Sequence, residues 1–253
     1  MIIKDFIQIP ALSGKEKRRL YIYLPPEYDN NTESYPVMYM FDGHNVFFDE
    51  DATYGKCWGM KDYLEQTNPK LIIVAVECNH EGNMRLSEYS PWNFEDKQLG
   101  KIKGLGKLYM DWLVTKLKPE VDASLRTKPG RDYTSICGSS MGGLMTVYAI
   151  TAYNHIFSKG AALSPSLWCK PENMLQLIHD SAIAENTILY MDYGSAESGY
   201  KTRMKYILKQ VGDAFLDKNV LLSLRIVPGG KHCEACWEQQ IPVFMKCLDY
   251  PKD

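Results

Sequence analysis

The sequence has no hydrophobic run long enough to cross a membrane and no excess of charge of either sign. No stretch approaches the roughly 18 uninterrupted apolar residues of a membrane span. The 29 Lys and Arg residues nearly balance the 31 Asp and Glu residues, which excludes the basic character of a nucleic-acid-binding protein. Charge at Lys4 and Asp5 interrupts the N-terminal segment, unlike a secretory signal. These absences predict a cytoplasmic protein with neither a membrane nor a nucleic-acid partner.

Cysteine is also too sparse to form a disulfide framework. The chain has seven cysteines in 253 residues, whereas disulfide-rich secreted domains are small and have an even number of closely spaced cysteines. We therefore expect most of them to be buried, reduced thiols. Internal repeats, low-complexity tracts and long polar linkers are missing from the sequence as well, and its 45% hydrophobic and 24% charged content is that of ordinary globular proteins. A single domain over residues 1–253 is expected.

Short β-branched or aromatic runs alternate with longer helical patterns along nearly the whole chain. Several of the runs are apolar throughout, as in strands that are covered on both faces. This alternation predicts an α/β fold with a mostly parallel sheet and helices on both faces. The predicted strands cover residues 21–25, 37–43, 71–77, 132–140, 159–166, 187–194 and 221–230, and the predicted helices cover 57–67, 102–119, 141–153, 171–179, 198–217 and 234–248.

Two stretches carry more specific expectations. In the helix predicted over 102–119, apolar residues recur at helical spacing, and Pro119 is expected to end the helix. Residues 78–100 have no regular pattern. A loop of that length in a compact domain usually has a function, so we expect it to form one wall of a substrate site.

The sharpest local motif is Gly-x-Ser-x-Gly over residues 138–142. Only Ser140 has glycine two positions before and two positions after it, which selects it over Ser139. A strand is predicted before the motif and a helix after it. In this context the motif is typical of a nucleophile elbow, a tight strand-to-helix turn that exposes a strained serine. A plain Gly/Ser-rich connection is the alternative, and the flanking strand and helix argue against it.

A serine nucleophile needs a histidine as its base. Two of the five histidines precede Ser140 in the chain, and two others lie on or beside predicted helices. His232 follows the last predicted strand in the glycine-containing segment Pro-Gly-Gly-Lys-His, from which a loop can carry an imidazole over the edge of the sheet. His232 is therefore the predicted general base.

The third catalytic group should be a carboxylate between the serine and the histidine in the chain. The segment after the penultimate strand offers Asp192 and Glu197. Asp192 lies within the strand, where alternation commits its side chain to one face. Glu197 follows the turn at Gly194, at the edge where catalytic groups of α/β sheets gather. We therefore predict Glu197 as the partner of His232. An alternative role for Glu197 is to favour the N-terminus of the next helix.

Two backbone N–H groups are predicted to form an oxyanion hole. The N–H of Met141 lies at the start of the helix that follows Ser140. The second is the N–H of His44, in the Asp-Gly-His-Asn segment after the strand predicted over 37–43. This prediction concerns the backbone of His44 and requires nothing of its imidazole.

Together these segments resemble the putative esterase family of the α/β-hydrolase superfamily, which includes esterase D, enterochelin esterases, and feruloyl and acetyl-xylan esterases. The resemblance implies an α/β-hydrolase fold and hydrolysis of carboxylic esters without a cofactor or metal. Two departures are noted: Cys233 stands where relatives often have Asn or Asp after the histidine, and some members lack the acid altogether. The segments that carry the resemblance are YPVMYMFDGHNVF (35–47), RLSEYSPW (85–92), ICGSSMGGL (136–144), ALSPSLW (162–168), YMDYGSAE (190–197) and GGKHCEACW (229–237).

Three other functions compete with a serine esterase. A metal hydrolase could be built from His44, His80, Glu77 and the His-Cys-x-x-Cys run at 232–236, but that run is only half of a zinc site and no second half has suitable spacing. A non-catalytic ligand-binding relative would not need all three triad residues. Acyl transfer to an alcohol would use the same acyl-enzyme, and the sequence does not distinguish it from hydrolysis.

The substrate is expected to be a small-molecule ester, with a carbohydrate-linked or aromatic group as one possibility. Aromatic side chains that could line its site are Tyr89, Trp92, Trp168 and Trp58. Arg85 could anchor a polar or anionic substrate group. Each of these residues could equally serve an ordinary structural role. The oligomeric state does not follow from the sequence.

Overall fold

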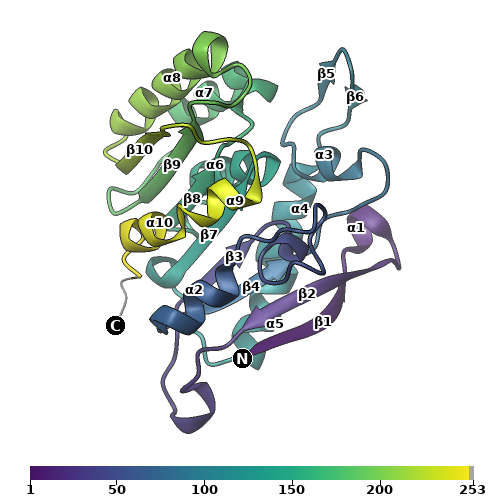
Figure 1. Ribbon diagram of the computed structural model, residues 1–253, viewed down its shortest axis with the longest axis vertical. Coiled ribbons are helices and arrows are strands. Elements are labelled where there is room, and N and C mark those ends of the chain that lie inside the picture. Colours follow the sequence, from purple (N-terminus) through teal and green to yellow (C-terminus); the bar gives the residue numbers. More distant parts are fainter. Residues whose placement is uncertain (251–253) are drawn as a thin grey trace.

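Eight strands form one sheet in the computed structural model, which describes residues 1–250 (Figure 1). Their order across the sheet is β1-β2-β4-β3-β7-β8-β9-β10, with β1, β2 and β4 paired antiparallel and all later neighbours parallel. This is the α/β fold with a mostly parallel sheet that the alternation of the sequence predicts, and it agrees with the α/β-hydrolase fold that the family resemblance implies. The strands are β1 (Ile2–Gln8), β2 (Lys17–Tyr23), β3 (Val37–Met40), β4 (Ile72–Val76), β7 (Thr134–Ser139), β8 (Lys159–Leu163), β9 (Ile188–Gly194) and β10 (Leu221–Val227).

The strands at the centre of the sheet are buried on both faces. Every residue of β3, β4 and β7 is buried, which explains why their sequences are apolar or small throughout rather than alternating. The edge strand β1 is mostly exposed and carries Lys4, Asp5 and Gln8. Its mixed composition explains why the sequence analysis did not predict it.

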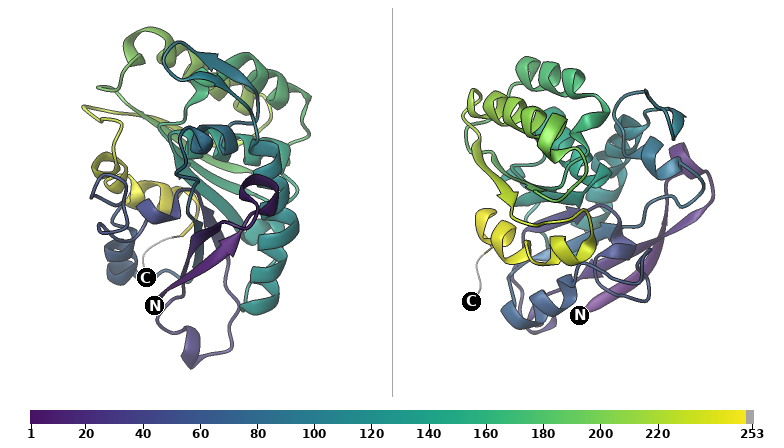
Figure 2. Two further views of the ribbon diagram at one scale, coloured as in Figure 1. Left: turned by 90° about the vertical axis from the view of Figure 1, so that its right-hand side faces the viewer. Right: turned by 45° about the horizontal axis from the view of Figure 1, so that its top comes forward.

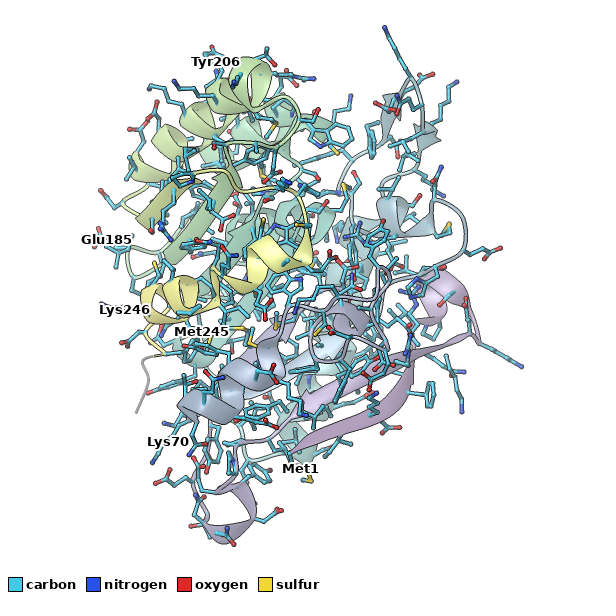
Figure 3. All side chains as sticks on the ribbon, in the orientation of Figure 1. Met1, Lys70, Glu185, Tyr206, Met245 and Lys246 are labelled. Carbon is cyan, nitrogen blue, oxygen red and sulfur yellow. The ribbon has the colours of Figure 1, made fainter. Side chains whose placement is uncertain are left out.

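Two helical layers enclose the sheet and form a hydrophobic core on each face. One core contains buried side chains of α4, α5, α6, α7 and α8, and the other contains those of α2, α9 and α10; Figure 2 shows the two layers on opposite sides of the strands. In Figure 3, Tyr206 on α8 points away from the protein and is 63% exposed, whereas Met245 on α10 is fully buried. The helices are α1 (Pro10–Ser13), α2 (Met60–Thr67), α3 (Met84–Glu88), α4 (Gly106–Trp112), α5 (Lys118–Ser124), α6 (Met141–Ala152), α7 (Pro171–Asp180), α8 (Lys205–Leu216), α9 (Glu234–Glu238) and α10 (Ile241–Cys247).

The helix predicted to end at Pro119 continues past it. A π-helical turn over Leu113–Leu117 joins α4 to α5, and Pro119 lies at the start of α5. Proline is tolerated in the first turn of a helix because its missing N–H would have no intrahelical acceptor there. Because the hydrogen bonding changes from π-helical to α-helical just before Pro119, the proline occupies the first turn of α5 although the helix itself is continuous.

The stretch 78–100, expected to be irregular, contains regular structure. It includes the short helix α3 and most of a small hairpin, in which β5 (Phe94–Asp96) pairs antiparallel with β6 (Gly100–Ile102). This segment stands beside the carboxyl ends of the parallel strands in Figure 1. Within residues 1–250, no helix is long and apolar enough to cross a membrane. The expectation of a single domain over 1–253 stays a prediction, and its last three residues lie outside the described part.

Candidate active site

Ser140 lies in a strained turn between β7 and α6. Its φ is 57° and its ψ −119°, a region that residues other than glycine rarely occupy. The glycines on either side are required by close contacts: a Cβ on Gly138 would lie 2.7 Å from the carbonyl carbon of Gly142, and one on Gly142 would lie 2.9 Å from the Cβ of Phe41. The turn is therefore as tight as a nucleophile elbow requires.

The imidazole of His232 connects the serine to a carboxylate. Its Nε2 lies 2.9 Å from the Oγ of Ser140, and its Nδ1 lies 2.7 Å from Oε2 of Glu197. Ser140 follows β7, Glu197 follows β9 and His232 follows β10, so three loops at the carboxyl edge of the sheet bring these residues together. This arrangement allows the imidazole to accept the serine proton while the carboxylate fixes the tautomer that does so.

Asp192, the other acid considered, does not contact His232. Its carboxyl group accepts hydrogen bonds from the Tyr190 hydroxyl at 2.8 Å and from the Ser164 backbone N–H at 3.1 Å. Burial raises the pKa of Asp192 to about 6, against the opposing effect of these two bonds. Asp192 is thus bound within the core beneath the site, as its place in β9 indicated.

Ser164 and Trp237 support the carboxylate of Glu197, and the sequence analysis assigned neither a role. The hydroxyl of Ser164 donates to Oε1 of Glu197 at 2.6 Å, and the indole N–H of Trp237 donates to that hydroxyl at 3.0 Å. The ring of Trp237 also packs edge-on against His232, with centroids 5.1 Å apart. Ser164 directly follows β8 and Trp237 lies in α9. Both fall within segments that carry the family resemblance, and this was the only sequence signal that pointed to them.

The backbone N–H groups of Met141 and His44 are free to bind an oxyanion. Neither donates a hydrogen bond to an acceptor in the part of the chain that the structure describes. Met141 is the first residue of α6, where the intrahelical acceptor is missing. His44 belongs to a 3₁₀ turn, η2 (Gly43–Asn45), directly after β3.

The half-buried side chain of Arg85 forms an ion pair with the buried carboxylate of Asp42 in the loop after β3. Its Nε and one terminal nitrogen each donate to a carboxylate oxygen of Asp42 at 2.7 Å. Burial alone would raise the pKa of the Asp42 carboxyl, but the Arg85 charge and hydrogen bonds lower it below its usual value. Asp42 has a φ of 55°, so this bidentate pair holds a strained residue two positions before His44.

Two pockets meet at Ser140, and both are lined by Arg85 and His232 as well. The first, which we call the polar pocket, has a volume of about 550 Å³. The second, the aromatic pocket, has a volume of about 440 Å³. Other lining residues of the polar pocket include His44, Asn79, His80, Cys233, Glu234 and Trp237, and those of the aromatic pocket include Leu86, Met141, Trp168, Tyr193, Arg203 and Met204.

The predicted substrate-binding aromatics have different positions. Trp168 lines the aromatic pocket and packs edge-on against Phe94. Trp92 packs against Tyr148 and lines neither pocket. The expectation that Tyr89 forms a substrate wall is wrong, because its side chain is fully buried between aromatic rings of the core.

Trp58 likewise belongs to the core, where it packs on Trp237 and Phe244. The segment 78–100 does contribute to the pocket walls, but through non-aromatic residues: Arg85, Leu86 and Asp96 in the aromatic pocket, and Cys78, Asn79, His80, Gly82 and Arg85 in the polar pocket. Polar and aliphatic side chains therefore take the place predicted for its aromatic residues.

Residues 12–186 match the model of the family described as "Putative esterase", and the chain belongs to that family. With the fold described above, this match makes the chain a carboxylic ester hydrolase of the α/β-hydrolase class.

The individual relatives and solved structures that resemble the chain share low sequence identity with it. The chain is 27% identical over 226 residues to the uncharacterized protein YbbA of Bacillus subtilis, a match that covers 85% of this chain and 86% of the relative. Among solved structures, an IroE-like serine hydrolase from Shewanella oneidensis superimposes with a TM-score of 0.73 at 20% identity, over 99% of this chain and 78% of that one. A ferulic acid esterase superimposes with a TM-score of 0.70 at 16% identity, over 99% and 97% of the two chains.

Proposed function

We propose that this protein hydrolyses its ester through an acyl-enzyme on Ser140. The observation that carries the proposal is the position of His232, whose two ring nitrogens lie 2.9 Å from the Ser140 hydroxyl and 2.7 Å from the Glu197 carboxylate. In the first step, Ser140 Oγ attacks the ester carbonyl and gives its proton to Nε2 of His232. His232 then protonates the leaving alcohol, which departs as the acyl-enzyme forms.

The second step repeats this chemistry with water. His232 takes a proton from a water molecule that attacks the acyl-enzyme, and then returns a proton to Ser140 Oγ as the acid is released. Glu197 keeps the imidazole in the tautomer with a bare Nε2 and stabilises the imidazolium. The N–H groups of Met141 and His44 bind the oxyanion of each tetrahedral intermediate, where a single donor is worth about 10²–10³ in kcat in a comparable enzyme.

The substrate we propose is a small ester with an aromatic or otherwise apolar part in the aromatic pocket. Trp168, Tyr193 and Met204 are among the residues that line that pocket, whereas imidazole, amide and carboxylate groups are among those that line the polar pocket. A ferulic acid esterase among the structural neighbours is named for an aromatic acyl group, which agrees with this division. The polar pocket would then receive the other, hydroxyl-bearing part of the ester.

The mechanism is tested by covalent labelling together with turnover. A fluorophosphonate should add one adduct to the wild-type chain, and Ser140→Ala should lose both the adduct and several orders of magnitude in kcat. Ser139→Ala is the matched control, because this neighbouring serine lies in β7 and has no place in the mechanism; it should still be labelled. A Ser140→Ala protein that kept substantial esterase activity would show that another nucleophile acts.

A further inference from the structure

A cluster of three metal-ligating side chains lies at the wall of the polar pocket, outside the proposed triad. His44, Cys78 and His80 each place one potential ligand atom within 4.8 Å of the ligand atoms of the other two. His44 comes from the loop after β3, and Cys78 and His80 come from the segment after β4. Adjacent parallel strands thus bring the three side chains to one place at the carboxyl edge of the sheet.

The hydrogen bonds of the two imidazoles leave the same nitrogen free on each ring. Nε2 of His44 lies 3.0 Å from the Oγ1 of Thr53, and Nε2 of His80 lies 3.0 Å from Oε1 of Glu77. His44 is only 2% exposed, yet its Nδ1 is buried without a hydrogen-bond partner among the described residues. A buried ring nitrogen without a partner is costly in free energy.

The outer contacts are those that orient metal-binding histidines. Such histidines usually give their second ring nitrogen to a carboxylate or another oxygen, which fixes the tautomer and leaves the first nitrogen for the metal. Glu77 is itself held in place by Arg19, whose side chain donates to it at 2.7 Å and 3.0 Å. These contacts leave Nδ1 of His44, which has no hydrogen-bond partner among the described residues, as the nitrogen for a metal.

Cys78 supplies a third, softer ligand. Its thiol is buried next to the Asp42 carboxylate. The nearby cation, Arg85, is already paired with Asp42. A divalent ion would replace the thiol proton, which would leave to solvent, because thiolate is the form that binds metal.

We propose that His44, Cys78 and His80 bind one divalent transition-metal ion. Two imidazoles and a thiolate are a ligand set that suits Zn²⁺ and its spectroscopic substitute Co²⁺, and three protein ligands leave a position open. The ion would stand at the wall of the pocket that Ser140 and His232 share, beside the proposed triad. It would therefore not replace the chemistry of Ser140.

The Cys-x-x-Cys run does not provide a competing site with His232. Both ring nitrogens of His232 already lie within hydrogen-bond distance of Ser140 and Glu197. Cys236 accepts a hydrogen bond from the backbone N–H of Lys231. Cys233 nevertheless lines the polar pocket, and Cys236 lies three positions further along the chain. The experiment must therefore separate this run from Cys78.

The test is a Co²⁺ titration of the reduced, metal-stripped protein, followed by near-ultraviolet and visible absorption. We expect one Co²⁺ per chain, a thiolate-to-cobalt charge-transfer band, and displacement by Zn²⁺. Cys78→Ser should lose the band. His80→Asn should weaken Co²⁺ binding by ~10-fold or more, at least as much as the loss of a residue that orients a metal ligand. The His80 side chain is half-exposed, so this variant is not expected to misfold.

Three control variants should keep the band and the stoichiometry: the double variant Cys233→Ser/Cys236→Ser, the exposed-histidine variant His179→Asn, and Ser140→Ala. The last separates this proposal from the proposed mechanism, since Ser140→Ala should abolish turnover and leave the metal site intact. A titration in which the wild-type protein shows no saturable binding of Co²⁺ would overturn the metal site. A band that survives Cys78→Ser but disappears with Cys233 and Cys236 would also overturn it.

Discussion

The hydroxyl of Ser164 donates a 2.6 Å hydrogen bond to Oε1 of Glu197, the carboxylate oxygen that does not face His232. The backbone N–H of Gly194 donates to the same oxygen at 2.8 Å, and Trp237 holds the Ser164 hydroxyl from its other side. These bonds fix the plane of the carboxylate and direct Oε2 at the imidazole. Ser164 is thus a positioning residue for the histidine, acting through Glu197.

Ser164→Ala should lower kcat with little change in KM. A hydrogen bond to a charged group contributes about 1.5–3 kcal/mol, and about 1.4 kcal/mol corresponds to a factor of ten in rate, so we expect a loss of roughly 10- to 100-fold. Ser158→Ala is the control, because Ser158 is equally buried but its hydroxyl has no partner among the described residues. Equal kinetics for the two variants would show that Ser164 does not position the triad.

Breaking the Arg85–Asp42 pair should destabilise the fold. Arg85→Gln would leave the buried Asp42 carboxylate beside no cation. The loss of one partner of a fully buried ion pair costs about 3–5 kcal/mol, and the partial exposure of Arg85 should make the loss here smaller than that. Urea unfolding measures this free energy. The double variant Arg85→Gln/Asp42→Asn should recover part of the loss, since no charge is then left unpaired. Arg203→Gln is the control, because Arg203 lines the same pocket and has no ion-pair partner among the described residues.

An unfolding free energy that does not change in Arg85→Gln would mean that water solvates the Asp42 carboxylate as well as Arg85 neutralises its charge. The same variant should also reduce ester hydrolysis, because Asp42 has a left-handed backbone conformation and begins the turn that carries the His44 N–H. A variant with lost stability and full activity would separate the ion pair from the oxyanion site.

The parts of the site that the sequence could predict are those fixed by local backbone geometry. Ser140 is marked by two glycines that a tight turn requires, and Glu197 and His232 each follow a strand whose apolar run is recognisable. Ser164 could not be assigned in the same way, because its role depends on Glu197, 33 residues away, and a serine after a strand has many other uses.

Errors arose where tertiary contacts decide the outcome. Tyr89 lies in a segment without regular pattern, which suggested a place in the wall of a substrate site, but its ring packs between Phe41 and Tyr109 in the core. Pro119 carries the sequence signal of a helix end, and the π-helical turn before it removes the reason for the helix to stop. The rings that enclose Tyr89 come from distant parts of the chain, so the residues around Tyr89 do not reveal them.

The buried carboxyl of Asp192 should make stability depend on pH. Burial raises its pKa from 3.8 to about 6, so between these values the folded chain binds a proton that the unfolded chain has lost. The contribution of Asp192 is therefore full below about pH 4 and is lost as pH rises through about 6, a difference of about 3 kcal/mol at 1.36 kcal/mol per pKa unit. The side chain of Asp192→Asn does not titrate, so this variant lacks that pH-dependent contribution to stability.

The measurement is the unfolding free energy of wild type and Asp192→Asn in urea, near pH 4 and near pH 7. Relative to wild type, the variant should be more stable at neutral pH than at acidic pH, and other titrating groups cancel in the difference. A difference that does not change with pH would mean that Asp192 titrates alike in the folded and unfolded chains.

Kinetics of two carboxylate variants distinguish the acids at the site. Glu197→Gln removes the charge that stabilises the imidazolium and lets the amide stabilise the wrong tautomer of His232, so kcat should fall by about 10⁴, as for the corresponding change in a serine protease. Asp192→Asn should remain within about tenfold of wild type, because Asp192 contacts Tyr190 and Ser164 rather than the imidazole. Both variants are compared on one ester at one pH, with folding checked by circular dichroism. Collapse of Asp192→Asn with a near-normal Glu197→Gln would reverse the assignment, and near-normal rates in both would indicate that Ser140 and His232 act as a dyad.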